Sequence, residues 1–140
     1  MKPRGLRIAC ALLVVVAAIP AWGAASSDQR FVDGLRQRRL YALAEMFCRQ
    51  RLAQPALASV REAELTAELS RVLAEWAVES TPDRRAAIWQ QAAQVTDEFA
   101  QRRPDHPQLV VVRLQGVLGG LLARGELLRQ EAQLTSNSAQ

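Results

Sequence analysis

The sequence predicts an all-α protein in which antiparallel helical hairpins stack on one another. Apolar residues make up 49% of the 140-residue chain and aromatic residues only 5%. The core must therefore be built mainly from Ala, Leu and Val, which suits close-packed helices better than sheets. Apolar positions recur every three or four residues, and no stretch alternates with the period of two expected of a strand. Prolines and capping residues divide the chain into five helical segments.

The first 25 residues have the layout of an export signal. Lys2, Arg4 and Arg7 precede an unbroken apolar run over residues 8–19, and mostly small residues follow it. A run of this length is too short for a permanent membrane-spanning helix, which needs about 20 residues, but it suits a secretory signal. We therefore expect an exported protein, periplasmic or secreted, that meets the membrane only through this segment before cleavage.

Cleavage is expected before Ser26, after the small residues at 23–25, with a cut directly after Gly23 as the second choice. Cys10 lies near the start of the apolar run, whereas a lipoprotein needs a cysteine at its end. A buried N-terminal core helix is the alternative interpretation of the segment. The predicted helical domain then covers residues 26–135, and the polar tail over 136–140 is expected to be frayed.

The charge distribution argues against nucleic-acid binding. The formal net charge is +4, but three of the 18 basic residues and none of the 14 acidic ones lie in the expected leader, so the remainder carries +1. The other basic residues are all Arg, and no basic run among them is longer than two. A nucleic-acid interface needs a concentrated basic face, so no such partner is expected.

Two short helices are predicted first. One runs from residue 28 to 38 with Ser27 as its N-cap, and the other runs from residue 41 to 53 and ends before Pro55. Their inward residues are mirror-symmetric about the turn between them: Phe31 with Cys48, Val32 with Phe47, and Leu35 with Ala44. This symmetry indicates an antiparallel hairpin.

A longer hairpin is predicted in the middle of the chain. Its first helix covers residues 59–79 and is expected to begin with a capping box of Ser59 and Glu62. Its second covers residues 82–103, with Thr81 as N-cap and Pro82 at the first helical position. The apolar positions again pair across the turn: Leu65 with Phe99, Leu69 with Val95, Val72 with Ala92, and Trp76 with Ile88. An antiparallel helix pair requires this symmetry.

A fifth helix is expected from about residue 107 to 134, after a linker whose two prolines forbid a continuous helix. Between residues 109 and 122 it is apolar on more than one face, so we expect it to contact neighbours on two sides. Gly116, Gly119 and Gly120 each cost the helix about 1 kcal/mol relative to Ala. They either admit another helix at close range or mark local weakness.

Few residues could carry chemistry. His106 is the only histidine, and Cys48 is the only cysteine beyond the leader, so a zinc site lacks ligands and no internal disulfide can form. We interpret His106 as a surface histidine and Cys48 as a buried small residue. A nucleophilic Cys48–His106 pair is the weaker alternative, because no orienting motif accompanies it. We predict no enzyme and no catalytic, cofactor-binding or metal-site residues.

The acidic residues of the third helix are interpreted as a solvated face that pairs with arginines. Nothing indicates the two carboxylates in a cleft that general acid–base catalysis needs. These residues are Glu62, Glu64, Glu68, Glu75 and Glu79. Trp76 and Trp89 flank the hairpin turn and are expected to pack in the core. The glycines at 116–120 lie in an apolar helix with no preceding strand, so they do not form a phosphate-binding loop.

The segment over residues 35–48 resembles the second half of a tetratricopeptide repeat. In that family a large residue precedes a tight turn, an aromatic residue follows it, and a small residue three positions later lets the helices touch. Leu35, Tyr41 and Ala44 occupy these places. Arg39 stands where the family usually has its turn glycine. The match is therefore partial.

Other positions extend or weaken the resemblance. Val32 replaces the small residue of the first helix, and Pro55 lies one residue early for the closing proline. A second, weaker match to the motif lies over residues 121–127. It has the turn glycine, Gly125, but lacks the alanine that follows it in the family. With the leader, the chain is similar to the N-terminal portion of large exported bacterial tetratricopeptide-like proteins, which act as binding scaffolds. The resemblance implies that the hairpins stack as a short α-solenoid and that the chain is a fragment of a longer repeat protein.

These patterns together predict a helical-repeat scaffold that mediates protein–protein interaction. Its expected partner is a protein, a peptide or further repeats of the same kind, and no cofactor is expected. The alternative is a small helical bundle that encloses an apolar ligand between the third, fourth and fifth helices. A purified monomer that carries a hydrophobic ligand would favour the bundle.

Overall fold

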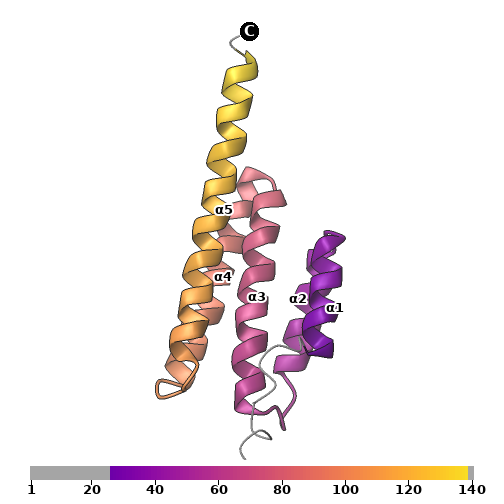
Figure 1. Cartoon of the computed structure of the whole chain (residues 1–140), viewed down its shortest axis with the longest axis vertical. Helices are drawn as coiled ribbons and strands as arrows, with labels where there is room; N and C mark the ends of the chain where they lie inside the picture. Colours follow the sequence, from indigo (N-terminus) through magenta and orange to yellow (C-terminus); the bar gives the residue numbers. More distant parts are fainter. Residues whose placement is uncertain (1–25, 139–140) are drawn as a thin grey trace, which may run out of the picture.

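The computed structural model describes residues 26–138, and this part of the chain consists of five α-helices without a strand (Figure 1). The helices are α1 (Ser27–Gln37), α2 (Tyr41–Leu52), α3 (Ser59–Glu79), α4 (Pro82–Arg102) and α5 (Leu109–Ser138). The all-α class is thereby confirmed, and the first four helices begin and end within one residue of their predicted bounds. The export signal predicted over residues 1–25 lies outside the described residues.

Helix α3 is the central element of the bundle. It packs against all four other helices, with α1 and α2 on one side and α4 and α5 on the other (Figure 1). No Cα atom of α1 or α2 lies within 8 Å of one in α4 or α5. The two outer pairs of helices are therefore held together mainly through α3.

The α3–α4 pair is the predicted antiparallel hairpin. Ser70 lies at the contact between the two helices, where its hydroxyl donates a hydrogen bond of 3.1 Å to the carbonyl of Ala92. Among the paired positions, the buried residues are Leu65, Leu69, Val72, Ile88, Ala92 and Phe99. Trp76 and Val95 are partly buried and pack against the same core. The mirror symmetry read from the sequence thus identified the inward faces of both helices.

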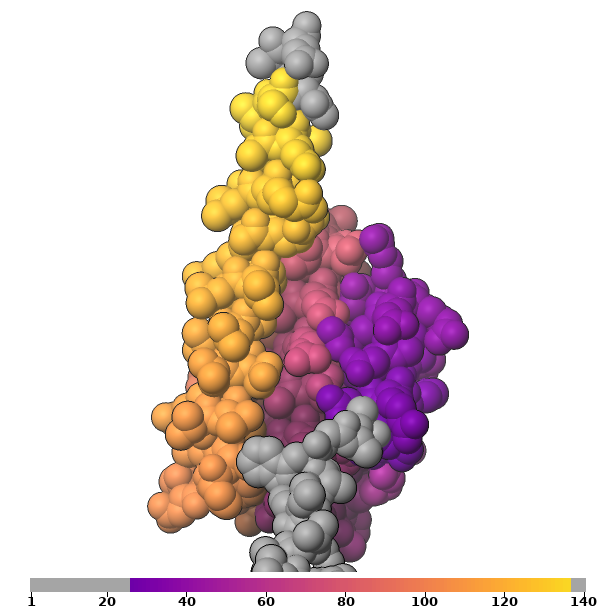
Figure 2. Space-filling model, viewed as in Figure 1, coloured from indigo at the N-terminus to yellow at the C-terminus, as the bar shows by residue number. Residues whose placement is uncertain are grey.

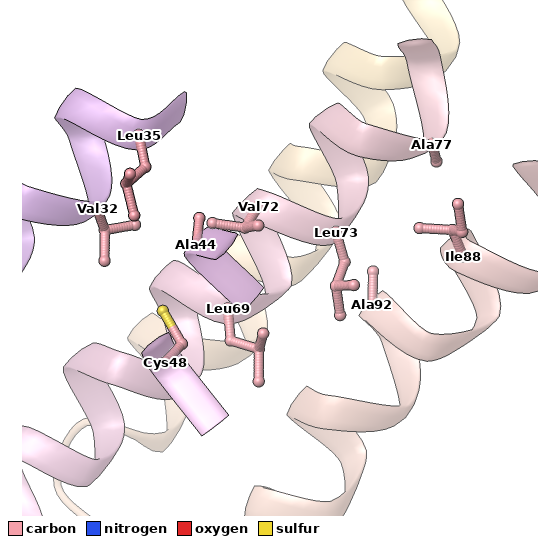
Figure 3. Close-up of a cluster of buried hydrophobic side chains, with 10 residues drawn as sticks. All are labelled: Val32, Leu35, Ala44, Cys48, Leu69, Val72, Leu73, Ala77, Ile88 and Ala92. Carbon is pink, nitrogen blue, oxygen red and sulfur yellow. The ribbon is translucent and has the colours of Figure 1, made fainter. Parts of the chain in front are cut away.

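Buried apolar side chains form two clusters. The larger one joins the α1–α2 hairpin to α3 and α4 (Figure 3), and its members are Val32, Leu35, Ala44, Cys48, Leu69, Val72, Leu73, Ala77, Ile88 and Ala92. The smaller one consists of Ala63, Phe99 and Val112, and it brings together α3, α4 and α5. Small residues at 44, 48 and 77 let helices approach closely, as dense packing requires.

The caps of α1 and α4 agree with the sequence to within one residue. Ser26, instead of the predicted Ser27, caps α1, and its hydroxyl accepts a hydrogen bond of 3.1 Å from the Gln29 amide. Thr81 and Pro82 occupy the predicted N-cap and first helical positions of α4. Both helices therefore begin at local signals.

The predicted capping box of α3 is wrong. Ala58 is the N-cap, and Ser59 already lies inside the helix without a side-chain cap. The Glu62 carboxylate instead accepts hydrogen bonds of 3.2 Å from Arg102 and Arg103 at the end of α4. Two charge-assisted hydrogen bonds at a buried carboxylate outweigh the single amide contact that a capping box would give it.

The turn between α1 and α2 closes around Arg39, whose φ is 58°. The amide of Leu40 donates to the carbonyl of Leu35 at 2.9 Å, and that of Arg39 donates to Arg36 at 2.8 Å. This hydrogen-bond pattern is a Schellman motif, which places one residue in the left-handed region and favours glycine there. Arg39 is also the position at which the tetratricopeptide resemblance expects glycine.

We expect the Arg39→Gly variant to be about 1 kcal/mol more stable than Arg39→Ala, because only glycine adopts this φ without strain. Both variants lose the exposed ion pair between Arg39 and Glu79 (3.0 Å), which contributes little to stability. The comparison of the two therefore isolates the effect of the backbone conformation at residue 39. Urea unfolding of the two chains measures the difference. Equal midpoints would contradict a strained turn.

Helix α5 packs on α3 and α4, so it contacts two neighbours as predicted. A Cβ added at Gly116 would lie 2.9 Å from Cγ2 of Thr96, which is too close. At Gly119 it would lie 3.6 Å from the Cβ of Ala74, an ordinary contact, and at Gly120 it would meet nothing within 4 Å. Close approach therefore explains Gly116, while Gly120 is only a weak helix former.

Matched alanine substitutions separate these two roles. Gly120→Ala should raise the free energy of unfolding by about 1 kcal/mol through helix propensity. Gly116→Ala should lower it by about 1 kcal/mol, because the clash with Thr96 exceeds the same propensity gain. Adding Thr96→Ala to Gly116→Ala should restore most of the loss. Thermal unfolding followed by circular dichroism gives all three values, and stabilisation by Gly116→Ala would disprove the close approach.

The C-terminal part of α5 extends past the rest of the bundle (Figure 1). The helix is continuous through Gly125 to Ser138. The second, weaker match to the tetratricopeptide motif, over residues 121–127, therefore does not form the turn that its glycine, Gly125, would mark in that family. Of the tail predicted over residues 136–140, residues 136–138 are helical and the last two residues lie outside the described part.

Candidate functional site

A groove runs along α3 between α1 and α5, and Figure 2 shows α3 between the indigo N-terminal helices and the orange and yellow α5. Two adjoining hollows of about 300 and 580 Å³ form it, and they share Arg71 and Gln115. We call this surface the α3 groove. Its lining includes Arg36 of α1, Glu68, Arg71 and Glu75 of α3, and Gln115, Leu118 and Leu122 of α5.

The groove arises because α1 and α5 both pack on α3 without reaching each other. Its lining on α3 runs from Arg61 to Glu79, a length of about 27 Å at 1.5 Å per residue. The α5 wall is apolar, with Leu118 and Leu122 at 42% and 74% exposure. The groove is therefore long enough for about five turns of helix and has one apolar side.

Arg36 is the electrostatic centre of the groove. Its side chain is 15% exposed. Its Nε donates to Glu75 at 2.9 Å and its Nη1 donates to Asp33 at 2.6 Å, while Nη2 forms a second bond to Glu75. Burial alone would lower the pKa of Arg36, but its hydrogen bonds to Glu75 and the nearby carboxylates raise it. The guanidinium therefore stays charged and fixes α1 against α3.

Glu68 is a buried carboxylate with spare hydrogen-bonding capacity. Its oxygens lie 3.6 Å from Arg71 and 3.9 Å from Arg36, which is beyond hydrogen-bond distance. Oε2 is buried and has no hydrogen-bond partner within residues 26–138. Burial raises the pKa of Glu68 above its ordinary value, although Arg71 and Arg36 oppose the rise. A donor that entered the groove would find an acceptor here.

Two of the five acidic residues on α3 are thus not solvated as predicted. Glu62 and Glu68 are 7% and 9% exposed, because α4 and α1 bring arginines over them. The predicted i,i+3 pairs of Glu64 with Arg61 (2.5 Å) and of Glu68 with Arg71 (3.6 Å) are present. The ion-pair prediction is confirmed, and the prediction of a wholly solvated face is wrong.

The raised pKa of Glu68 makes its contribution to stability depend on pH. The folded chain retains this proton at pH values where the unfolded chain has lost it, so ionisation destabilises the fold as pH rises through and above about 4.5. We expect Glu68→Gln to match the original chain near pH 4 and to become more stable than it toward about pH 7. Denaturant unfolding at both pH values measures this. A stability difference that does not change with pH would contradict the raised pKa.

A second ion-pair cluster holds the N-terminal end of the groove. Asp28 of α1 lies 2.8 Å from Arg51 of α2 and 2.9 Å from Arg61 of α3. Burial would raise the pKa of Asp28, but hydrogen bonds from Arg61 and Arg51 outweigh it and hold the pKa below the ordinary value. Three helices therefore meet at one ionised carboxylate, which fixes the α1 wall.

No family model, curated protein or solved structure matches the chain. The tetratricopeptide resemblance therefore stays a prediction. The role of the groove has to be inferred from its own residues.

The structure separates the two residues considered as a nucleophilic pair. Cys48 is buried in the α1–α2–α3 cluster as predicted, and burial together with the charge of Glu68 raises the pKa of its thiol to about 12. His106 lies at the other cluster, with its ring 5.2 Å from that of Phe99. It is partly buried, because the linker folds it onto Phe99.

Both tryptophans of the hairpin pack against the larger cluster, as predicted. The guanidinium of Arg84 lies 5.8 Å from the ring centroid of Trp76. Trp89 also lines a hollow of about 310 Å³ between α3, α4 and α5, together with Val117 and Leu121. Its Nε1 is buried without a hydrogen-bond partner in the described part of the chain.

Two further findings concern the described helices. Within residues 26–138, no three His, Cys, Asp or Glu side chains are grouped so that they could hold a metal ion. None of the helices between Ser27 and Ser138 has the length and hydropathy needed to cross a membrane.

Sequence reasoning missed the Arg36–Glu68–Glu75 network. A usable signal was present, since Glu68, Arg71 and Glu75 are spaced by three and four and therefore share one side of α3. The periodicity could not predict the position of α1, and it is α1 that brings Arg36 over that side of α3.

Proposed function

We propose that this chain is an exported scaffold module that binds a helical segment of another protein in the α3 groove. The observation that carries the proposal is an open groove about five turns long, with an apolar wall on α5 and with Glu68 in its lining, whose buried Oε2 has no hydrogen bond within the described residues. Amphipathic helices bind in grooves of this kind by laying their apolar face against one wall.

The lining residues define the chemistry of the partner. Apolar side chains spaced by three and four would pack on Leu118 and Leu122. A lysine, arginine or amide on the same segment would donate to Oε2 of Glu68, which otherwise stays unsatisfied. We therefore infer a partner helix with one cationic or amide residue among its apolar positions.

The tetratricopeptide resemblance supports the same surface. In a stack of helical hairpins, the first helix of each pair faces one concave side, where partners bind. Here α1 and α3 are the first helices of the two hairpins, and they line the groove together with α5, which follows the second hairpin. A short α-solenoid is the finer architecture that we propose for this arrangement, with further repeats of the same kind as a second class of partner.

Export is part of the proposal. It is supported by the N-terminal pattern of charge and hydropathy and by the position of Ser26, which caps α1 directly after the expected cleavage point. Removal of the leader would therefore leave the first helix with its cap. N-terminal sequencing of the chain from the cell envelope or medium should begin at Ser26, and an intact Met1 in that fraction would contradict export.

Capture of a partner from envelope extracts tests the binding proposal. Leu122→Glu changes an exposed residue of the apolar groove wall (74% exposed), whereas Leu128→Glu changes a similarly accessible leucine (66% exposed) that does not line the groove. The partner should be recovered by the original chain and by Leu128→Glu, and at least about tenfold less by Leu122→Glu. No partner at all, or equal recovery by both variants, would contradict the proposal.

A non-catalytic role agrees with the high pKa of Cys48, which keeps that thiol protonated. One observation favours a second candidate function, the binding of an apolar ligand in the α3–α4–α5 hollow, which is lined by Trp89. A fluorescent fatty acid that quenches the tryptophan emission of the original chain, but not that of Trp89→Phe, would support it. Absence of quenching in both would exclude it.

A further inference from the structure

One side of α5 carries a row of four exposed apolar residues, of which Val117 and Leu121 also border the hollow beside Trp89. Val110, Leu114, Val117 and Leu121 are 76%, 53%, 59% and 59% exposed. Their spacing of four, three and four places them on one side of the helix. This side is opposite to Val112, which is buried in the smaller cluster. We call these four residues the outer row.

The outer row is complementary to itself when two copies of α5 lie antiparallel. Val110 then faces the partner's Leu121, and Leu114 faces the partner's Val117. The same two contacts recur on the other half of the pair, because the arrangement is two-fold symmetric. Four consecutive layers of apolar contact result, with the spacing that knobs-into-holes packing requires.

The flanking residues favour the antiparallel orientation over the parallel one. In the antiparallel register, Val111 lies opposite the partner's Leu118, and Arg113 lies opposite the partner's Gly120, so no like charges meet. In a parallel pair, Arg124 occupies the next position of the row and would face the partner's Arg124. Two buried guanidinium groups in contact would be strongly unfavourable.

The exposed apolar area suits a dimer. Val111 and Leu118 are 55% and 42% exposed and border the outer row. With on the order of 100 Å² of apolar surface per side chain, the six residues together supply about 600 Å² per chain. A stable interface of standard size uses about 800 Å² per partner, which the polar residues at the rim can complete.

We propose that two copies of this chain associate through the outer row of α5 as an antiparallel dimer. The dimer and the proposed peptide binding share Val111 and Leu118, which line the α3 groove, but none of the four row residues lines it, so a substitution at Leu114 changes the dimer contact alone. Failure of one proposal therefore leaves the other standing.

Sedimentation equilibrium of the purified chain tests the association. The original chain should be dimeric at about 10 μM, and Leu114→Glu should raise the dissociation constant at least about 100-fold. Leu128→Glu adds the same charge to an exposed leucine (66%) outside the antiparallel register and should leave the dimer intact. Circular dichroism should show equal helix content in all three. A monomeric original chain, or equal dissociation constants, would overturn the proposal.

Disulfide trapping tests the register. In a Cys10→Ser background, chains with Leu114→Cys are mixed with chains carrying Val117→Cys, while the buried Cys48 does not compete. The mixture should form a cross-linked heterodimer on oxidation, and Leu114→Cys alone should not, because it faces the partner's Val117. Cross-linking of Leu114→Cys to itself would indicate a parallel pair and contradict the antiparallel arrangement.

Discussion

Phe99→Ala is expected to lower the free energy of unfolding by about 3–5 kcal/mol. Phe99 is fully buried, and it is the largest member of the cluster that joins α3, α4 and α5. Its ring also supports His106 in the linker. Removing it leaves a cavity at the contact of three helices, which α5 cannot fill because its position is fixed by Gly116 against Thr96. Urea unfolding measures the loss.

A matched control for this variant is Leu122→Ala, which removes a large apolar side chain that is 74% exposed. Its effect on stability should stay within about 0.5 kcal/mol. Similar losses for the two variants would mean that the Phe99 cluster is not a packed core.

Arg36→Ala should produce the second large effect, a loss of about 2–3 kcal/mol. The substitution leaves Glu68 buried and Glu75 without its bidentate partner, and breaking a buried ion pair on one side is costly. We expect less than the full cost of a buried pair, because Asp33 and Glu75 are 37% and 39% exposed and water partly replaces the guanidinium. Thermal unfolding at neutral pH measures the loss.

The control for Arg36 is Arg49→Ala. Arg49 forms an ion pair of 2.8 Å with Glu45, but its side chain is 51% exposed and the pair lies within one helix. Its loss should cost about 0.3–0.5 kcal/mol. If both arginine variants lost equal stability, the network over α3 would have no special role in fixing α1.

Much of the fold was predictable because its signals are local. The mirror symmetry of the α3 and α4 apolar positions depends only on helix periodicity and turn length, and it identified buried faces that include Leu69 and Ala92. The start of α4 is local in the same way, because Thr81 and Pro82 occupy the N-cap and first helical positions that the sequence indicates.

The groove and its charges were not predictable, because they depend on how separate hairpins dock. Glu62 has the spacing of a capping residue, yet Arg102 and Arg103 from the far end of α4 bind it. Glu68 belongs to a charged pattern that suits solvent, yet α1 covers it. Likewise, sequence alone could not tell Gly116 from Gly120, since only Gly116 meets a neighbouring helix.

The central position of α3 has a consequence for energetics. The α1–α2 hairpin and the α4–α5 pair share this helix but make no close backbone contact with each other. Substitutions on opposite flanks that lie outside the larger cluster therefore have few common partners, and their free-energy effects should add. Away from that cluster, the two flanks can be redesigned independently as long as α3 is left unchanged.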